Sequence, residues 1–216
     1  MTDSPRMEVP DVSAQEKLNQ IAVARRDGLD ARLEAVRDHL AGAFGGLGFE
    51  DHYGELTVVA SAAQLADLLR FAKDDPALRC EMLTDVTAVH WPGGRVEHRA
   101  QETTGWPTYA IEQEGRIDVL YMLLSVTHGH RFRIRVSLPD DQPIVASAVS
   151  CYRSANVLER EVFDLMGVRF EGHPRLERIF MPEEWEGHPL RKDYPLGGVE
   201  VQYKGATVPP PDERQY

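Results

Sequence analysis

The densest group of charged side chains is the run Glu159-Arg160-Glu161, which Asp164 follows three positions later. Carboxylates at this spacing could act as a general acid and base, or bridge two metal ions inside a helical bundle. A bridged metal pair would also need a Glu-x-x-His motif, and the sequence contains none. The alternative is a solvated helix surface on which Arg160 pairs with Asp164, a weak interaction at helical spacing.

Histidines occur in two kinds of motif. His128 and His130 have the spacing of one side of a strand and could bind a metal if a third ligand converged, but no such ligand is visible nearby. The triplet Gly-His-Pro occurs twice, with His173 and His188 at its centres. Proline restricts the preceding residue to extended backbone, so both imidazoles should project from turns. They could serve the turn itself, contact a partner, or bind a metal.

The remaining motifs that could carry chemistry are weak. Cys80 and Cys151 lie far apart, belong to no Cys-x-x-Cys pair and have no recognisable nucleophile context. The glycines between 42 and 48 follow a predicted helix instead of opening one after a strand, so they indicate a helix end and not a dinucleotide-binding loop. The sequence therefore predicts no catalytic residue, no metal ligand and no cofactor-binding residue in this chain.

Composition limits the class of protein further. With 216 residues, 42% of them hydrophobic and 27% charged, the chain is typical of one globular domain with appendages. Its 35 acidic residues outnumber 24 basic ones, which disfavours a nucleic-acid-binding protein. The longest apolar stretch, 119–126, is far shorter than the roughly 20 residues that span a bilayer, and the first thirty residues lack a signal core. We expect a cytoplasmic protein that meets a membrane only through partners.

Apolar periodicity predicts the elements that must position these residues. It indicates helices over 29–44, 62–73 and 156–166, and strands over 55–60, 79–91, 117–126 and 132–138. The polar segment between 92 and 115 is expected to be a long hairpin connection. Asn156 with Glu159 resembles a capping box, and Gly167 suits a left-handed helix end. The pattern predicts an α/β fold of the α+β sandwich type, with a mixed β-sheet and flanking helices.

One predicted strand carries three guanidinium groups on one side. Arginines at 131, 133 and 135 alternate with apolar residues at 132, 134 and 136, so one face should enter the core while the other carries positive charge. A scaffold that binds acidic ligands is one hypothesis for this face, although the negative net charge argues against it.

The last fifty residues differ from the rest in composition. Seven of the fourteen prolines lie between 174 and 211, a density that forbids long helices and interior strands. The segment nevertheless carries the large apolar residues Leu176, Ile179, Phe180, Met181, Trp185, Leu190, Tyr194 and Leu196. We expect an extended tail that becomes ordered against another protein. The predicted organisation is a flexible lead-in over 1–28, an α/β domain over 29–166 and a partner-docking tail over 167–216.

Residues 159–196 read EREVFDLMGVRFEGHPRLERIFMPEEWEGHPLRKDYPL. This run closely resembles the signature of one subunit family of bacterial respiratory complex I, the proton-pumping NADH–quinone oxidoreductase. The family is that of the C-type subunit, also called the thirty-kilodalton subunit. Upstream, 83–89 and 121–128 resemble the family's two strand motifs, so the resemblance covers roughly residues 54–196. The segment between 91 and 117 is longer than the usual family hairpin.

The resemblance implies a peripheral subunit at the cytoplasmic face of the cell membrane. Such a subunit holds no FMN, iron–sulfur cluster or NADH site; the partner subunits carry FMN, the iron–sulfur clusters and the quinone. It would pack on the quinone-reducing module, chiefly on the D-type subunit and its iron–sulfur neighbours. Its role would be assembly and structural support of a complex that couples NADH oxidation by quinone to proton translocation.

The predicted partner interface lies in the carboxylate helix and the tail. Arg178 and Arg191 are suited to bidentate pairing with carboxylates, and the aromatic residues to filling pockets of a partner. The helix carboxylates would either receive arginines from the partner or bind the tail's own cations, and we expect the second for at least one of them. The interface residues are Glu159, Arg160, Glu161, Asp164, His173, Arg178, Phe180, Trp185, His188, Arg191, Lys192, Asp193 and Tyr194.

Two other functions stay open at this point. The same fold could belong to a homologous subunit of a membrane-bound hydrogenase or of a dehydrogenase with another electron donor. A protein of a different class, a stand-alone metal- or carboxylate-dependent enzyme, would use His173, His188 and the carboxylates of 159–164.

Overall fold

A computed structural model describes residues 28–98, 109–195, 201–203 and 206–208 of the chain. The lead-in predicted over 1–28 lies outside this part except for its last residue. The described helices are α2 (Ala31–Ala43), α3 (Leu65–Asp74) and α4 (Ala155–Met166). The described strands are β1 (Gly48–His52), β2 (Glu55–Ala60), β3 (Met82–Trp91), β4 (Gly94–His98), β5 (Tyr109–Gln113), β6 (Arg116–Ser125), β7 (His130–Pro139), β8 (Ile144–Ala146), β9 (Arg169–Glu171), β10 (Val201–Tyr203) and β11 (Ala206–Val208).

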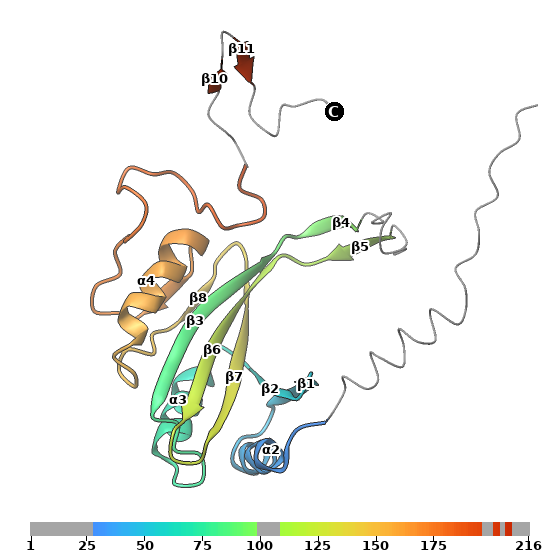
Figure 1. Ribbon diagram of the computed structural model, residues 1–216, viewed down its shortest axis with the longest axis vertical. Coiled ribbons are helices and arrows are strands. Elements are labelled where there is room, and N and C mark those ends of the chain that lie inside the picture. The colour runs from blue at the N-terminus through green and yellow to red at the C-terminus, as the bar shows by residue number, and fades with distance from the viewer. Residues whose placement is uncertain (1–27, 99–108, 196–200, 204–205, 209–216) are drawn as a thin grey trace, which may run out of the picture.

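The centre of the fold is a five-stranded sheet with the order β1-β2-β7-β6-β3. β2 and β7 are parallel, and the other neighbours are antiparallel. The long strands β3, β6 and β7 lie side by side, and α4 lies along β3 (Figure 1). The sheet is therefore mixed, and the predicted α+β architecture with flanking helices is confirmed.

One face of the three long strands β3, β6 and β7 is buried. In the register, Val86 lies beside Tyr121 and Ile134, and the next row is formed by Ala88, Val119 and Val136. All six side chains are buried. The helices cover this face with the apolar sides that their spacing predicts, such as Leu65, Leu68, Leu69 and Ala72 of α3.

The opposite face carries the alternate residues of the same strands, most of which are half-buried or exposed. We call it the open sheet face. It is formed by Met82, Asp85, Thr87 and Val89 of β3, Leu120, Met122, Leu124 and the buried Asp118 of β6, and Arg131, Arg133 and Arg135 of β7.

The three arginines of the open sheet face are already paired with carboxylates. Arg131 and Arg133 lie 3.2 Å and 3.3 Å from Glu55, and Arg135 donates to Glu50 at 2.9 Å. The hypothesis of a scaffold that binds acidic ligands through these arginines loses its basis, because strands β1 and β2 supply the counter-charges.

The polar segment after β3 forms the predicted hairpin. β4 and β5 pair in antiparallel register from Gly94–Gln113 to His98–Tyr109, and they extend the line of β3 and β6 away from the body of the sheet (Figure 1). The tip of this hairpin, 99–108, lies outside the described residues.

Helix α4 begins differently from the prediction. Its N-cap is Ser154, which makes no side-chain capping bond, so the capping box of Asn156 with Glu159 is wrong. Glu159 points inward instead: its carboxylate accepts the Ser147 hydroxyl and the Ala148 backbone N–H, both at 2.6 Å. These two bonds fasten the loop after β8 to α4.

The tail is attached to its own domain along residues 168–195. Its first part, β9, pairs in parallel with β8, and Arg169 N–H donates to Pro143 O at 2.8 Å. Val168 and Phe170 are buried in the core. The expectation that another protein supplies the folding template is therefore wrong for this part of the tail, since its backbone partners belong to the same chain.

Within the described residues, no helix is both long enough and apolar enough to cross a bilayer.

Glu159 should make the stability of the fold depend on pH. Burial raises its pKa to about 7 against the two hydrogen bonds that lower it. The folded protein then keeps this proton at pH values where the unfolded chain has lost it, so the free energy of unfolding should fall as pH rises from about 5 to about 7, by at most about 3 kcal/mol. Urea unfolding at a series of pH values measures this decrease. Glu159→Gln, which cannot ionise, should flatten it, and an unchanged slope would contradict the assignment.

Candidate partner interface

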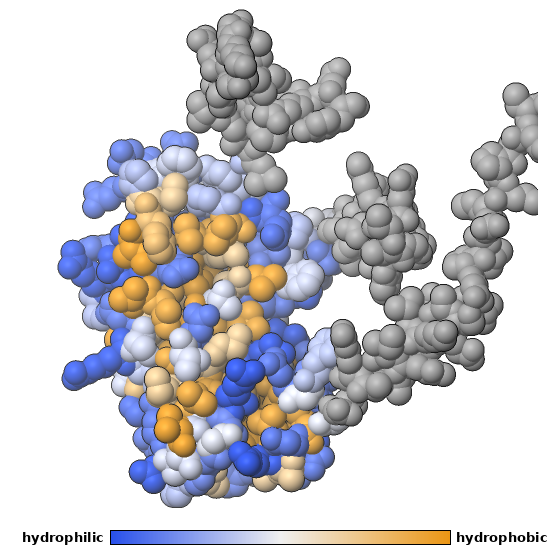
Figure 2. Space-filling model, in the orientation of Figure 1, coloured by the Kyte–Doolittle hydropathy of each residue, from blue (hydrophilic) through white to orange (hydrophobic). Residues whose placement is uncertain are grey.

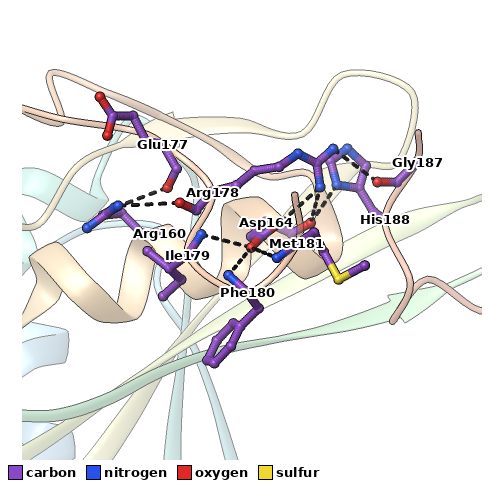
Figure 3. A network of polar contacts seen from close by, with 9 residues as sticks. All are labelled: Arg160, Asp164, Glu177, Arg178, Ile179, Phe180, Met181, Gly187 and His188. Carbon is purple, nitrogen blue, oxygen red and sulfur yellow. Dashed lines mark hydrogen bonds and ion pairs between the residues drawn. The ribbon is translucent and has the colours of Figure 1, made fainter. Parts of the chain in front are cut away.

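The interface predicted from sequence is organised around the carboxylate of Asp164, whose side chain is fully buried. Arg178 donates to it from Nη1 at 2.8 Å, and the backbone N–H groups of Ile179, Phe180 and Met181 all donate to Oδ2, at 2.9, 2.7 and 3.0 Å (Figure 3). Burial alone would raise the pKa of Asp164, but these donors outweigh burial and lower it. The expectation that a helix carboxylate binds a cation of the tail is confirmed.

The C-terminal end of α4 is capped by the second Gly-His-Pro motif and the residues after it. The carbonyls of Asp164, Leu165 and Met166 lack partners inside the helix. They accept, in that order, His188 Nδ1–H at 2.9 Å, the Leu190 backbone N–H at 3.0 Å and Arg191 Nε–H at 3.0 Å. The guanidinium of Arg191 is also stabilised by the negative end of the helix dipole. We call residues 177–191, which wrap this helix end, the strap.

Two glycines allow the strap to approach so closely. Gly167 ends α4 with the predicted left-handed backbone, at φ 79°, and a Cβ atom there would lie 2.5 Å from His188 Cδ2. Gly187 has φ 82°, and a Cβ atom there would lie 2.8 Å from the ring of Tyr194. A larger residue at either position would meet both backbone strain and a collision.

Most of the other polar interface residues also bind within the chain. Arg160 does not pair with Asp164, as the alternative of a solvated helix surface required, but donates to the carbonyls of Glu177 and Arg178, at 3.1 and 3.4 Å (Figure 3). His173 Nε2 lies 3.0 Å from the carbonyl of Asn156, the contact of a turn residue.

The two residues that follow the strap contact strand β3. The Lys192 backbone N–H donates to Nδ1 of the buried His90 at 2.9 Å, and the Asp193 carboxylate lies 3.7 Å from the same atom. Glu161, by contrast, points to solvent from α4. Of the predicted acidic interface residues, Glu161 and Asp193 are thus exposed at the surface.

The two arginines expected to pair with carboxylates both bind within the chain. Arg178 spans from the carboxylate of Asp164 to the carbonyl of Gly187, and Arg191 donates to the carbonyls of Met166 and Asp140. Arg178 thus finds its carboxylate on α4, whereas Arg191 binds carbonyl oxygens, and the donors of both residues close the strap.

The apolar side chains of the strap remain outside. Phe180 is 61% exposed, Leu190 51% and Trp185 40%. Hydrophobic residues gather over the part of the surface where α4 and the neighbouring strands lie (Figure 2). A cavity of about 400 Å³ adjoins the strap and is lined in part by Ile144, Gly167 and Arg191. The strap thus fixes its backbone inward and presents apolar side chains outward.

The other candidate chemical groups are engaged or unreactive. Among the described residues, no three His, Cys, Asp or Glu side chains are grouped to hold a metal ion. The rings of His128 and His130 stack 5.9 Å apart, and His128 Nε2 binds the carbonyl of Pro76, so this pair stabilises a turn. Burial raises the pKa of Cys80 to about 12, which keeps its thiol protonated and unreactive.

Together, the fold and the strap define a class of protein: an α+β domain whose C-terminal segment is held to its last helix by buried hydrogen bonds and exposes apolar side chains. The chain belongs to the family of the 30 kDa subunit of the respiratory-chain NADH dehydrogenase, whose family model matches residues 58–200. The resemblance noted from the sequence is thereby confirmed.

Similar proteins are named as the C-type subunit of NADH-quinone oxidoreductase. The chain is 40% identical to that of Mycolicibacterium gilvum over 189 residues, which cover 84% of this chain and 76% of the relative. It is 39% identical to that of a Nocardioides species over 215 residues, covering 95% and 79%. With Saccharopolyspora erythraea the identity is 43% over 162 residues, covering 75% of this chain but 58% of the longer relative.

Two solved structures resemble the fold. A trypsin-resistant fragment (1–134) of Nqo5 aligns with a TM-score of 0.51 at 31% identity, and the alignment covers 67% of this chain and 99% of the fragment. A chain of a membrane-bound sulfane sulfur reductase, an archaeal respiratory membrane complex, aligns with a TM-score of 0.58 at 23% identity, covering 76% and 85%. The second likeness shows a shared fold alone.

Removal of the charge on Asp164 should release the strap. Asp164→Asn leaves the Arg178 guanidinium buried without its counter-ion, which should lower the free energy of unfolding by about 3 kcal/mol. The Arg178 peptide bond should also become accessible to trypsin in the native chain. Urea unfolding and limited proteolysis followed by mass spectrometry measure the two effects.

The control for this variant is Glu161→Gln, on the exposed side of the same helix, which should change the free energy of unfolding by less than about 0.5 kcal/mol. Equal cleavage at Arg178 in Asp164→Asn and in the unmodified chain would contradict the role of the carboxylate.

The close approach at Gly167 can be separated from its backbone strain. Gly167 and Gly172 share φ 79°, but no atom lies within 4 Å of a Cβ atom at Gly172. Gly172→Ala should therefore cost about 1–2 kcal/mol from strain alone. Gly167→Ala should cost clearly more, because its methyl group also displaces His188. Thermal and urea unfolding of both variants provide the comparison, and equal losses would show that the contact with His188 is unimportant.

Proposed function

We propose that this chain acts as the structural C-type subunit of an NADH–quinone oxidoreductase. In this role it binds no FMN, iron–sulfur cluster or quinone itself and supports the assembly of the quinone-reducing module. The family membership and the relatives named as this subunit support the assignment to this complex. NADH oxidation, electron transfer to quinone and proton translocation are then properties of the whole assembly.

The observation that carries this proposal is the combination of a fixed backbone with exposed aromatic rings in the strap. Phe180 donates its backbone N–H to buried Asp164, yet its ring is 61% exposed. Because the backbone under this ring is already ordered, a partner that covers the ring has to restrict only the side chain and not the loop. Burial of such a ring contributes about 2 kcal/mol, the value expected of an interface anchor.

The proposed partners are other subunits of the complex, chiefly the D-type subunit and the iron–sulfur subunits beside it. Those partners would carry the cofactors, and they alone would connect this chain to the cytoplasmic face of the membrane. The exposed carboxylates Glu161 and Asp193 and the ammonium group of Lys192 are available at the edge of the strap to pair with charges of a neighbour. In this position they contribute mainly to specificity.

The geometry argues against the stand-alone enzyme. Glu159 and Asp164 are both buried and accept hydrogen bonds from the chain itself, and the rings of His173 and His188 lie against backbone carbonyls. A general acid or base needs access to substrate, and a metal ligand needs a free electron pair directed at the ion. The family and the named relatives likewise favour NADH as electron donor over the hydrogenase alternative.

Loss of the two aromatic anchors should weaken assembly without destabilising the chain. The double variant Phe180→Ala/Trp185→Ala should bind at least about thirty-fold more weakly, since one lost anchor costs about 2 kcal/mol. Purification of the complex through an affinity tag on another subunit, with quantitative mass spectrometry, measures the amount of this chain that is retained. NADH–quinone reductase activity should fall in parallel.

The matched control is Val126→Ala, an exposed apolar residue in the turn between β6 and β7, which should assemble normally. The melting temperature of the isolated double variant should equal that of the unmodified chain. Full retention of the double variant in the complex would show that the strap is not a docking surface.

A further inference from the structure

His90 is a buried titratable group that contacts the two residues after the strap. It lies on β3, its side chain is fully buried, and its register partner on β6 is the apolar Ile117. Its Nδ1 atom accepts the Lys192 backbone N–H at 2.9 Å. A ring nitrogen that accepts a hydrogen bond carries no proton, so the ring is neutral and carries its proton on Nε2.

The Nε2–H group of His90 has no hydrogen-bond partner among the described residues. A carboxylate oxygen of Asp140 lies 3.6 Å from Nε2, which is too long for a hydrogen bond. Two contacts fix Asp140 in this place: a Cβ atom at Gly115 would collide with its carboxylate, and its carbonyl accepts Arg191 Nη2–H at 2.6 Å. A buried N–H without an acceptor costs free energy, so the neutral ring is only partly satisfied.

Two carboxylates face the ring from opposite sides. Asp140 lies 3.6 Å from Nε2, and Asp193 lies 3.7 Å from Nδ1. At these distances a negative charge favours the protonated imidazolium, whereas burial of the ring favours the neutral form. The cations at this end of the strap are the guanidinium of Arg191, which donates to the Asp140 carbonyl, and Lys192, which is exposed. Because Nε2 carries the proton, it has no electron pair for a metal ion, and uptake of a second proton is the reaction left to this ring.

We propose that His90 is a pH-dependent switch that holds the two residues after the strap by two alternative sets of hydrogen bonds. In the neutral form, which the structure shows, Nδ1 accepts the Lys192 N–H. Uptake of a proton from solvent converts Nδ1 into a donor, so two N–H groups face each other and this bond is lost. The Asp193 carboxylate, which is 58% exposed, then turns inward to accept Nδ1–H, and Asp140 accepts Nε2–H.

The two forms present different groups to a partner. In the neutral form the Asp193 carboxylate is at the surface, and in the protonated form it is drawn toward the ring. The backbone at 192 loses its attachment to β3 in the same step. Acid should therefore weaken the docking of this part of the chain. This effect on docking rests on the proposed function, whereas the switch itself is a property of the isolated chain.

Solution NMR of the full-length chain tests the switch. The nitrogen signals of the His90 ring distinguish an accepting Nδ1 from an imidazolium, and the Lys192 amide signal reports on the hydrogen bond. Between about pH 8 and about pH 5, both sets of signals should change with one midpoint. The Lys192 amide should exchange with solvent about five- to tenfold faster in the protonated form, after correction for the intrinsic effect of pH, because one hydrogen bond is lost.

Two results of this titration would overturn the switch. One is a Lys192 amide signal that stays constant while the His90 ring titrates. The other is a ring that stays neutral down to the pH at which the chain unfolds, or that is already an imidazolium at about pH 8.

Two variants separate the ring from its surroundings. His90→Asn keeps an acceptor oxygen near the position of Nδ1 but cannot be protonated, so the Lys192 amide should stay bonded at every pH. Asp193→Asn changes an exposed residue and does not depend on refilling the core. It removes the proposed acceptor of Nδ1–H and should shift the midpoint to lower pH by about half a unit. An unchanged midpoint would overturn the exchange of partners.

The matched control is Asp67→Asn, an exposed carboxylate on α3, which packs beside the residues that precede β3. This variant should leave the midpoint of the Lys192 signal unchanged. A shift equal to that of Asp193→Asn would show that net charge and not the contact with Asp193 sets the midpoint, and it would overturn the assignment.

The effect on docking is measured in the complex. The unmodified chain and His90→Asn are each assembled with a tagged partner subunit and washed at about pH 6 and about pH 7.5. The unmodified chain should be retained less at the lower pH, and His90→Asn should be retained equally at both. Equal retention of the unmodified chain would overturn the effect on docking and leave the proposed function intact. Failure of both chains to enter the complex at either pH would contradict the proposed function, which the NMR titration does not assume.

Discussion

The buried carboxylate of Asp164 is the constraint on which the C-terminal half of the molecule depends. An ionised group without water costs several kcal/mol unless donors surround it. Here the donors are the guanidinium of Arg178 and three successive backbone N–H groups, so the chain from 178 to 181 must pass directly over α4. The last carbonyls of the same helix impose a similar requirement on Leu190 and Arg191. Together these two sets of polar atoms determine the path of a segment that has no regular secondary structure.

This arrangement also decides which side chains face the solvent. Because the polar atoms of the strap are directed inward, Phe180, Trp185 and Leu190 are left outside on a backbone that cannot easily move. The open sheet face shows the same division, with its arginines paired inside the chain and its apolar residues beside them. The strap is suited to contact with protein, in which shape and apolar area matter more than free charge.

A cofactor-free role agrees with the state of the titratable groups. Asp164 is saturated with donors, Glu159 fastens a loop, and the thiol of Cys80 is kept protonated by burial. Each of these groups stabilises the fold. In the proposed function, the chemistry of the complex belongs to the other subunits, and this chain contributes contact surfaces.

The class of fold and the family could be assigned from the residues alone. The alternation at 132–138 and the spacing of Leu65, Leu68 and Leu69 predict the buried faces correctly, because the period of a strand or helix fixes which side chains share a side. The same patterns could not reveal β1, β8 or β9, which are short and form only by pairing with another segment. They also misassigned Glu159 to a capping box.

Only the folded structure decides which polar groups form hydrogen bonds within the chain and which stay exposed to other proteins. The sequence predicts that a cation of the tail pairs with a carboxylate of the helix, as Arg178 does with Asp164. The three backbone donors to the same carboxylate depend on where the strap crosses the helix. The sequence shows which charged and polar groups the chain has and how far apart they lie along it. The direction in which each group points depends on contacts between residues far apart in sequence, and those contacts exist only after folding.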